Sequence, residues 1–127
     1  MSFISGLTAL FYYNLVEQIP SQVWVFVPEE LRTTNSKYKL LRLKKIDHIG
    51  VVENKYFRIA SIERALVDAL HFSSKIGERV AIAATVRAIR DGKTRIELIM
   101  KMARGLKVDK RISKYWELII GSIESEL

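Results

Sequence analysis

Asp47, Glu53 and Lys55 are the residues whose types and spacing come nearest to a catalytic motif in this chain. Two carboxylates can hold a divalent cation, and a nearby lysine can steady an attacking water, which is the chemistry of a metal-dependent nuclease. Glu-x-Lys is also a common surface triplet, and here it falls at a predicted hairpin turn. We therefore keep a metal-dependent nuclease only as an alternative to a non-enzymatic domain.

Other common catalytic arrangements are missing from the sequence. The chain has no cysteine, and His48 and His71 lie in different predicted elements, so a zinc site would need distant carboxylates. There is no G-x-S-x-G elbow, no glycine-rich phosphate loop and no Asp-x-Asp pair. We expect no catalytic residue, no metal ion and no cofactor, and the lack of cysteine fits a reducing cytoplasm.

Basic residues are unevenly distributed along the chain. The net charge is +7, yet the first thirty residues contain no lysine or arginine. The excess begins with a cluster that no acidic residue interrupts: Arg32, Lys37, Lys39, Arg42, Lys44 and Lys45. A second set follows near the end: Lys107, Lys110, Arg111 and Lys114. Such clusters bind phosphate or acidic proteins, so the first is our candidate nucleic-acid interface, with a merely solvated basic surface as the alternative.

The element that organises these sites is a helix predicted to begin at Ser61. Ser61 can cap the first turn, and Glu63 suits the positive end of the helix dipole. An inward stripe follows at helical spacing, formed by Ala65, Leu66, Ala69 and Leu70. Arg64 and Asp68 lie four apart on a neighbouring face, so we interpret them as a structural pair rather than an acid/base pair.

The residues before Ser61 read mostly as strands. Alternation and apolar runs predict strands over 23–27, 38–44, 49–52 and 56–59, after a short helix over 5–15. Residues 29–36 are polar and predict a surface loop, and Asn54 marks a hairpin turn. Trp24 lies in a run that is apolar on both faces, so we expect that strand to be central and Trp24 to be buried.

The residues after Ser61 read as helices, over 61–72, 78–90, 94–103 and 109–125. The last has an apolar face wide enough to need packing against the domain body or a partner. Its candidate interface residues are Tyr115, Trp116, Ile119 and Ile120. An oligomerisation module, and hence a homo-oligomer, is therefore a second alternative.

Together these elements predict one α/β (α+β) domain spanning residues 1–127. We expect a small mixed, largely antiparallel sheet in the N-terminal half, packed by the N-terminal helix and by a C-terminal bundle of about four helices. The apolar start of the chain is too short to span a bilayer and has no preceding basic residue, so we expect neither a membrane partner nor a signal peptide.

Three segments, in this order and spacing, resemble the C-terminal domain of AbiEi-type antitoxins. They are Phe3-Ile4-Ser5-Gly6-Leu7-Thr8-Ala9-Leu10, then Leu15-Val16-Glu17-Gln18-Ile19-Pro20 before Val23-Trp24-Val25-Phe26-Val27-Pro28, and finally Arg58-Ile59-Ala60-Ser61-Ile62-Glu63-Arg64-Ala65-Leu66-Val67-Asp68-Ala69-Leu70. The similarity covers roughly the first three quarters of the chain. Members of this family are predicted transcriptional regulators of type IV toxin–antitoxin, or abortive infection, systems of prokaryotes.

The resemblance implies a non-enzymatic domain that neutralises a separately encoded nucleotidyltransferase-like toxin. It also implies that a basic surface of this domain contributes to DNA binding, which would employ the cluster between Arg32 and Lys45. The family's N-terminal winged helix is absent from these residues, because residue 1 lies almost on the first motif. We therefore expect either a fragment of a longer protein or a stand-alone member of the family.

Overall fold

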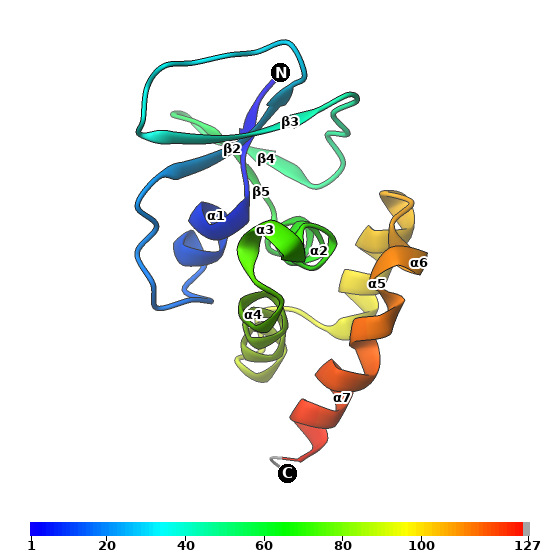
Figure 1. Cartoon of the computed structure of the whole chain (residues 1–127). Coiled ribbons are helices and arrows are strands. Elements are labelled where there is room, and N and C mark those ends of the chain that lie inside the picture. The colour runs from blue at the N-terminus through cyan, green and yellow to red at the C-terminus, as the bar shows by residue number, and fades with distance from the viewer. Residues whose placement is uncertain (126–127) are drawn as a thin grey trace.

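The structure, a computed structural model, describes residues 1–125. A five-stranded sheet forms one layer, and the helices pack on one side of it (Figure 1). The strands are β1 (Phe3–Ile4), β2 (Val23–Pro28), β3 (Tyr38–Leu43), β4 (Val51–Glu53) and β5 (Arg58–Ala60), in the spatial order β3-β2-β1-β5-β4. The predicted α/β class with a mixed sheet in the N-terminal half is therefore confirmed.

The sheet is more evenly mixed than the largely antiparallel one that we expected. β1 pairs antiparallel to β2 and β4 antiparallel to β5, whereas β1–β5 and β2–β3 are parallel. The difference arises because β1 has only two residues, too few to show an alternating pattern, and joins the two halves of the sheet at its centre. β2 is central, as predicted, and Trp24 is buried.

The helical part follows the predicted order with two corrections. Its elements are α1 (Gly6–Tyr12), α2 (Ile62–His71), α3 (Ser73–Ile76), α4 (Glu78–Arg90), α5 (Ile96–Gly105), α6 (Asp109–Ile112), a 3-10 turn (Ser113–Tyr115) and α7 (Trp116–Glu124). The break predicted at Ser73 holds the short helix α3, and the last predicted helix is divided by the 3-10 turn. No helix of the described residues is long and apolar enough to cross a membrane.

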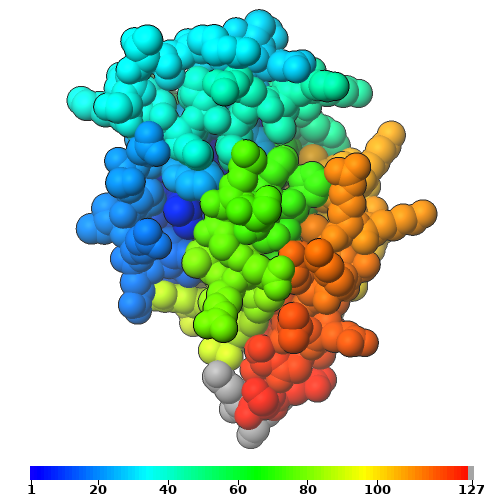
Figure 2. All heavy atoms as spheres, in the orientation of Figure 1, coloured from blue at the N-terminus to red at the C-terminus, as the bar shows by residue number. Residues whose placement is uncertain are grey.

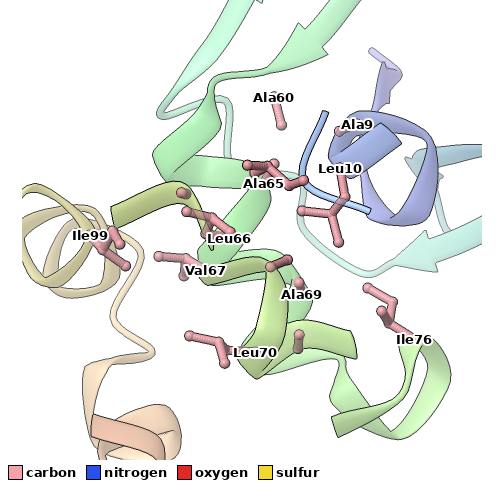
Figure 3. Packing of buried hydrophobic residues seen from close by; sticks show 14 of the residues in the cluster. Ala9, Leu10, Ala60, Ala65, Leu66, Val67, Ala69, Leu70, Ile76 and Ile99 are labelled. Atoms are coloured by element: carbon pink, nitrogen blue, oxygen red, sulfur yellow. The ribbon is translucent and has the colours of Figure 1, made fainter. Parts of the chain in front are cut away.

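Helix α2 lies at the centre of the core. Its N-terminus is capped as expected, because Ser61 Oγ accepts a hydrogen bond from Arg64 N at 3.2 Å. All residues of 64–70 are buried, so the helix is surrounded rather than packed by a single stripe. Figure 3 shows its apolar side chains between α1, which contributes Leu10, and α5, which contributes Ile99.

The loops also follow sequence patterns. Asn54 Oδ1 accepts hydrogen bonds from Tyr56 N at 2.9 Å and Phe57 N at 3.0 Å, which closes the β4–β5 hairpin at the predicted residue. Residues 29–36 are exposed and form the short crossover between the parallel strands β2 and β3. Because β2 already has β1 on its other side, β3 is left at the edge of the sheet.

Candidate nucleic-acid interface

The first basic cluster lies on the edge strand β3 and on the segments that flank it. Its six side chains are all exposed: Arg32, Lys37, Lys39, Arg42, Lys44 and Lys45. This exposure follows from the position of β3, because an edge strand has a neighbouring strand on one side only. The cluster is therefore accessible to a large ligand.

Alternation along β3 divides the cluster between the two faces of the sheet. Lys39 is on the same side as the buried Leu41, and its Nζ lies 6.0 Å from the ring centroid of Trp24. Arg42 is on the opposite side, with Leu40. The cluster thus wraps around the sheet edge instead of forming one flat patch.

Acidic side chains do not neutralise the cluster. The ion pairs found within residues 1–125 join Arg58 to Glu53, Arg64 to Asp68 and Arg87 to Asp91, and none includes a member of the cluster. Arg32 differs from the others, because its Nη1 donates to the carbonyl oxygens of Glu29 and Leu31 in its own loop, at 2.6 and 3.0 Å. These hydrogen bonds hold the guanidinium of Arg32 against its own loop and leave the formal positive charge of the cluster unchanged.

A hollow of about 160 Å³ lies between Lys45 and the segment that carries the second basic set, and its lining also includes Asp47 and Asp68. Lys45 lines one side of it, and Leu106 and Val108, which flank Lys107, line the other. His71 also lines the hollow, and its pKa is lowered first by burial and then by the charge of Arg111. In Figure 2 the segment after β3, in teal, and the α5–α6 region, in gold and orange, meet on one side of the molecule.

A buried polar network forms the inner wall of this hollow. Ser5 Oγ donates to Asp68 Oδ2 at 2.8 Å, and Arg64 Nε lies 3.0 Å from both carboxylate oxygens of Asp68. Arg64 and Asp68 are each only 3% exposed. Their side chains join the start of α1 to the middle of α2, and this role is structural, as the sequence indicated.

Arg64 also fixes the segment that follows β3. Its Nη1 donates to the carbonyl oxygens of Asp47 at 2.6 Å and Ile49 at 2.7 Å, and its guanidinium carbon lies 4.9 Å from the ring centroid of Phe3. These contacts hold residues 47–49 against α2. Because Lys45 precedes this segment, the buried arginine also positions the C-terminal end of the basic cluster.

Burial dominates the electrostatics of the network. Desolvation raises the pKa of Asp68 to about 6, although the charge of Arg64 and the hydrogen bonds from Ser5 and Arg64 oppose that rise.

The burial of Arg64 and Asp68 was not predicted, because the sequence pattern placed them only on a face of the helix beside the apolar stripe. A signal for burial was present, because Arg64 and Asp68 are enclosed by the apolar residues Ala65, Leu66, Ala69 and Leu70.

The nuclease candidates are separated by their local contacts. Asp47 Oδ1 accepts from Ile49 N at 3.0 Å, while Glu53 Oε1 pairs with Arg58 Nε at 2.7 Å. Lys55 Nζ lies 5.6 Å from the ring centroid of Tyr56, in the hairpin turn. Within the part of the chain that the structure describes, no three histidine or acidic side chains are arranged to hold a metal ion. The geometry thus gives the nuclease alternative no support.

The predicted partner interface on the last helix requires a correction. Tyr115 and Ile119 are 4% and 0% exposed, because they face this chain's own core. Tyr115 Oη lies 2.8 Å from Ser73 Oγ and donates to Glu78 Oε2 at 3.2 Å, which anchors the turn before α7. Trp116 is half-buried, and only Ile120, at 39%, is substantially exposed. The wide apolar face mainly serves internal packing.

No protein-family model matches the chain, and no curated protein is significantly similar to it. The functional argument therefore depends on the geometry of the basic surface and on the resemblance carried by the three sequence segments.

Proposed function

We propose that this chain is a non-enzymatic regulatory domain of the AbiEi antitoxin type, which binds the nucleic-acid backbone through the basic surface around β3. The observation that carries the proposal is the exposed basic cluster on and beside β3, which no ion pair of the described residues engages, with the segment of the second basic set lying across a hollow from Lys45. Lysine and arginine that neutralise phosphates release condensed counterions, which supplies affinity without sequence reading.

The wrapped shape of the cluster suits a curved polyanion. Lys39 and Arg42 lie on opposite faces of the sheet edge, so they can contact phosphates on either side of it. No acidic partner has to be displaced first, since no ion pair of the described residues engages the cluster. The surface thus supports binding, and its role in the proposal is to position a regulator on DNA.

The remaining parts of the proposal come from the family resemblance. They are neutralisation of a nucleotidyltransferase-like toxin, action by binding rather than catalysis, and a location in the cytoplasm. The absence of cysteine is consistent with that compartment. The toxin would be the principal protein partner, and DNA the second ligand.

A charge-reversal experiment tests the DNA-binding part. We expect the double variant Lys45→Glu/Arg111→Glu to bind a labelled duplex about tenfold more weakly at low salt, because it reverses one charge in each basic set. The slope of log affinity against log salt should also fall by about one to two. Fluorescence anisotropy across a salt series measures both quantities.

The matched control is Lys55→Glu/Arg79→Glu, which makes the same change in net charge at exposed positions away from the hollow. Lys55 lies in the hairpin at the opposite side of the sheet from β3, and Arg79 lies at the start of α4. An equal loss in this control, or wild-type binding that does not respond to salt, would contradict the proposal.

A further inference from the structure

The outer edge of β3 has backbone N–H and C=O groups that form no hydrogen bonds with another strand of the sheet. Val23 N donates to Lys37 O at 2.7 Å, so alternate residues from Lys37 onward direct their backbone groups toward β2. The residues between them, Tyr38, Leu40 and Arg42, therefore direct their N–H and C=O groups away from the sheet.

Only part of this outer edge is occupied by the chain itself. Tyr38 N donates to Asn35 O at 3.3 Å, and Tyr38 O accepts from Gln22 Nε2 at 3.3 Å. The backbone groups of Leu40 and Arg42 have no such contacts among the described residues. They leave two donors and two acceptors, which are the groups that an added β-strand requires.

A hollow of about 190 Å³ lies beside these groups. Leu40, Leu41, Arg42 and Leu43 form one side of it, and Phe72 and Lys75 form the other. The hollow can receive an apolar side chain from an incoming strand, because its walls are mostly aliphatic or aromatic. Its charged members are both basic, so the same strand should carry carboxylates.

We propose that the edge of β3 at Leu40–Arg42 is a docking site for an extended acidic segment of a partner protein, which adds to the sheet as a further strand. Its apolar side chains would enter the hollow beside Phe72, and the carboxylates that alternate with them would lie on the opposite face of the sheet edge, where they would meet Arg42. Basic side chains on an edge strand oppose pairing with neutral or basic strands, so the same residues give the site its selectivity.

The inference does not depend on DNA binding, because phosphates would use the basic side chains whereas the partner strand uses the backbone of Leu40 and Arg42. A proline at residue 40 distinguishes binding of a partner strand from binding of DNA. Leu40→Pro removes an outward N–H that makes no ladder bond, keeps every charge, and places a ring at the edge where the partner strand would lie. Leu40→Ala is the matched control, since it shortens the side chain but keeps the N–H.

The probe is an acetylated eight-residue peptide that alternates glutamate and valine, labelled for fluorescence anisotropy. We expect Leu40→Pro to bind it at least about tenfold more weakly than wild type, and Leu40→Ala within about threefold. Duplex DNA should bind wild type and Leu40→Pro alike. Equal peptide binding by Leu40→Pro and wild type, equal binding of a peptide with lysine in place of glutamate, or no binding at all would overturn the inference.

Amide hydrogen exchange on the wild-type protein provides a measurement that needs no variant. We expect the peptide to slow exchange at Leu40 and Arg42, while Lys39 and Leu41, whose amides already face β2, change little. Unchanged exchange at Leu40 and Arg42 under saturating peptide would overturn the proposal. So would equal slowing by duplex DNA, which would assign the edge to nucleic acid.

Discussion

Helix α2 and strand β3 use charged residues in opposite ways. In α2 the residues 64–70 are all buried, and the charged pair Arg64–Asp68 lies among them with its hydrogen bonds satisfied inside the protein. In β3 only Leu41 is buried, and its basic side chains form no ion pair with the described residues 1–125. The first arrangement gives rigidity, and the second leaves charge available for a ligand.

This difference separates stability from binding within a small domain. A buried ion pair is tolerated only where hydrogen bonds compensate the desolvation of both charges, and Ser5 and two backbone carbonyls supply those bonds here. The basic residues of β3 keep their hydration, so they can be changed with little effect on folding. Variants in the two regions should therefore have contrasting phenotypes.

The largest effect should come from removing Asp68. Asp68→Ala leaves the buried Arg64 without its carboxylate, so we expect the free energy of unfolding to fall by about 3–5 kcal/mol. Urea denaturation followed by circular dichroism measures this loss. Arg42→Ala on β3 is the matched control and should leave stability nearly unchanged. Comparable losses in the two variants would remove the contrast between the regions.

A smaller effect is expected at Gly50, where the segment after β3 meets α2. Gly50 has φ +76°, and an added Cβ would lie 2.9 Å from Arg64 Cβ and 2.8 Å from Met102 Cε. We expect Gly50→Ala to lower the free energy of unfolding by about 1–3 kcal/mol, through backbone strain and crowding. Gly92 has φ +70°, but an added Cβ there would meet no atom within 4 Å, so Gly92→Ala should lower the free energy of unfolding by less. Thermal unfolding of both variants measures the two losses. Equal costs would show that the contact with α2 is not tight.

A third effect should be a pH dependence that originates in α2. Because the pKa of Asp68 is raised to about 6 in the folded protein, the folded state binds more protons than the unfolded state between about pH 4 and pH 6. The contribution of Asp68 to stability is therefore present below about pH 4 and is lost as the pH rises through 6. The variant Asp68→Asn lacks this pH-dependent contribution, because its side-chain amide does not titrate.

Denaturation at several pH values gives the free energy of unfolding of wild type and of Asp68→Asn. The difference between the two proteins measures the contribution of Asp68. The stability of wild type relative to Asp68→Asn should decline between pH 4 and pH 6 and then become constant. A difference that does not vary with pH would show that Asp68 titrates alike in both states. A matching series for Lys44→Gln, at the residue after β3, should show no such trend, since this exposed substitution leaves the buried network of α2 unchanged.

Local sequence signals predicted most of the secondary structure. Ser61 marked the start of α2, Asn54 marked the hairpin turn, and α4 has the predicted bounds. These features depend on residues close together in the chain, such as a capping hydroxyl or a turn-forming amide. The strand β1 was missed because two residues contain no pattern, and its pairing partners lie far away in the sequence.

The candidate site was predicted only in part. The exposed basic residues of β3 followed from composition and alternation, but the hollow between Lys45 and residues 106–108 did not, because tertiary packing creates it. The same cause buries Tyr115 and Ile119, two of the four residues predicted as an interface on the last helix. An apolar stripe that includes Tyr115 and Ile119 looks the same whether it packs on the domain or on a partner.

The sequence by itself determined the helix from Ser61, the hairpin, the exposed basic strand and the absence of any cysteine chemistry, because each depends on residue type and short-range spacing. Only the tertiary structure decided that β3 lies at an edge, that Arg64 and Asp68 are buried, and that Lys45 and the segment around Leu106 line one hollow. Those features are contacts between segments far apart in the chain, and no local pattern specifies which segments will meet.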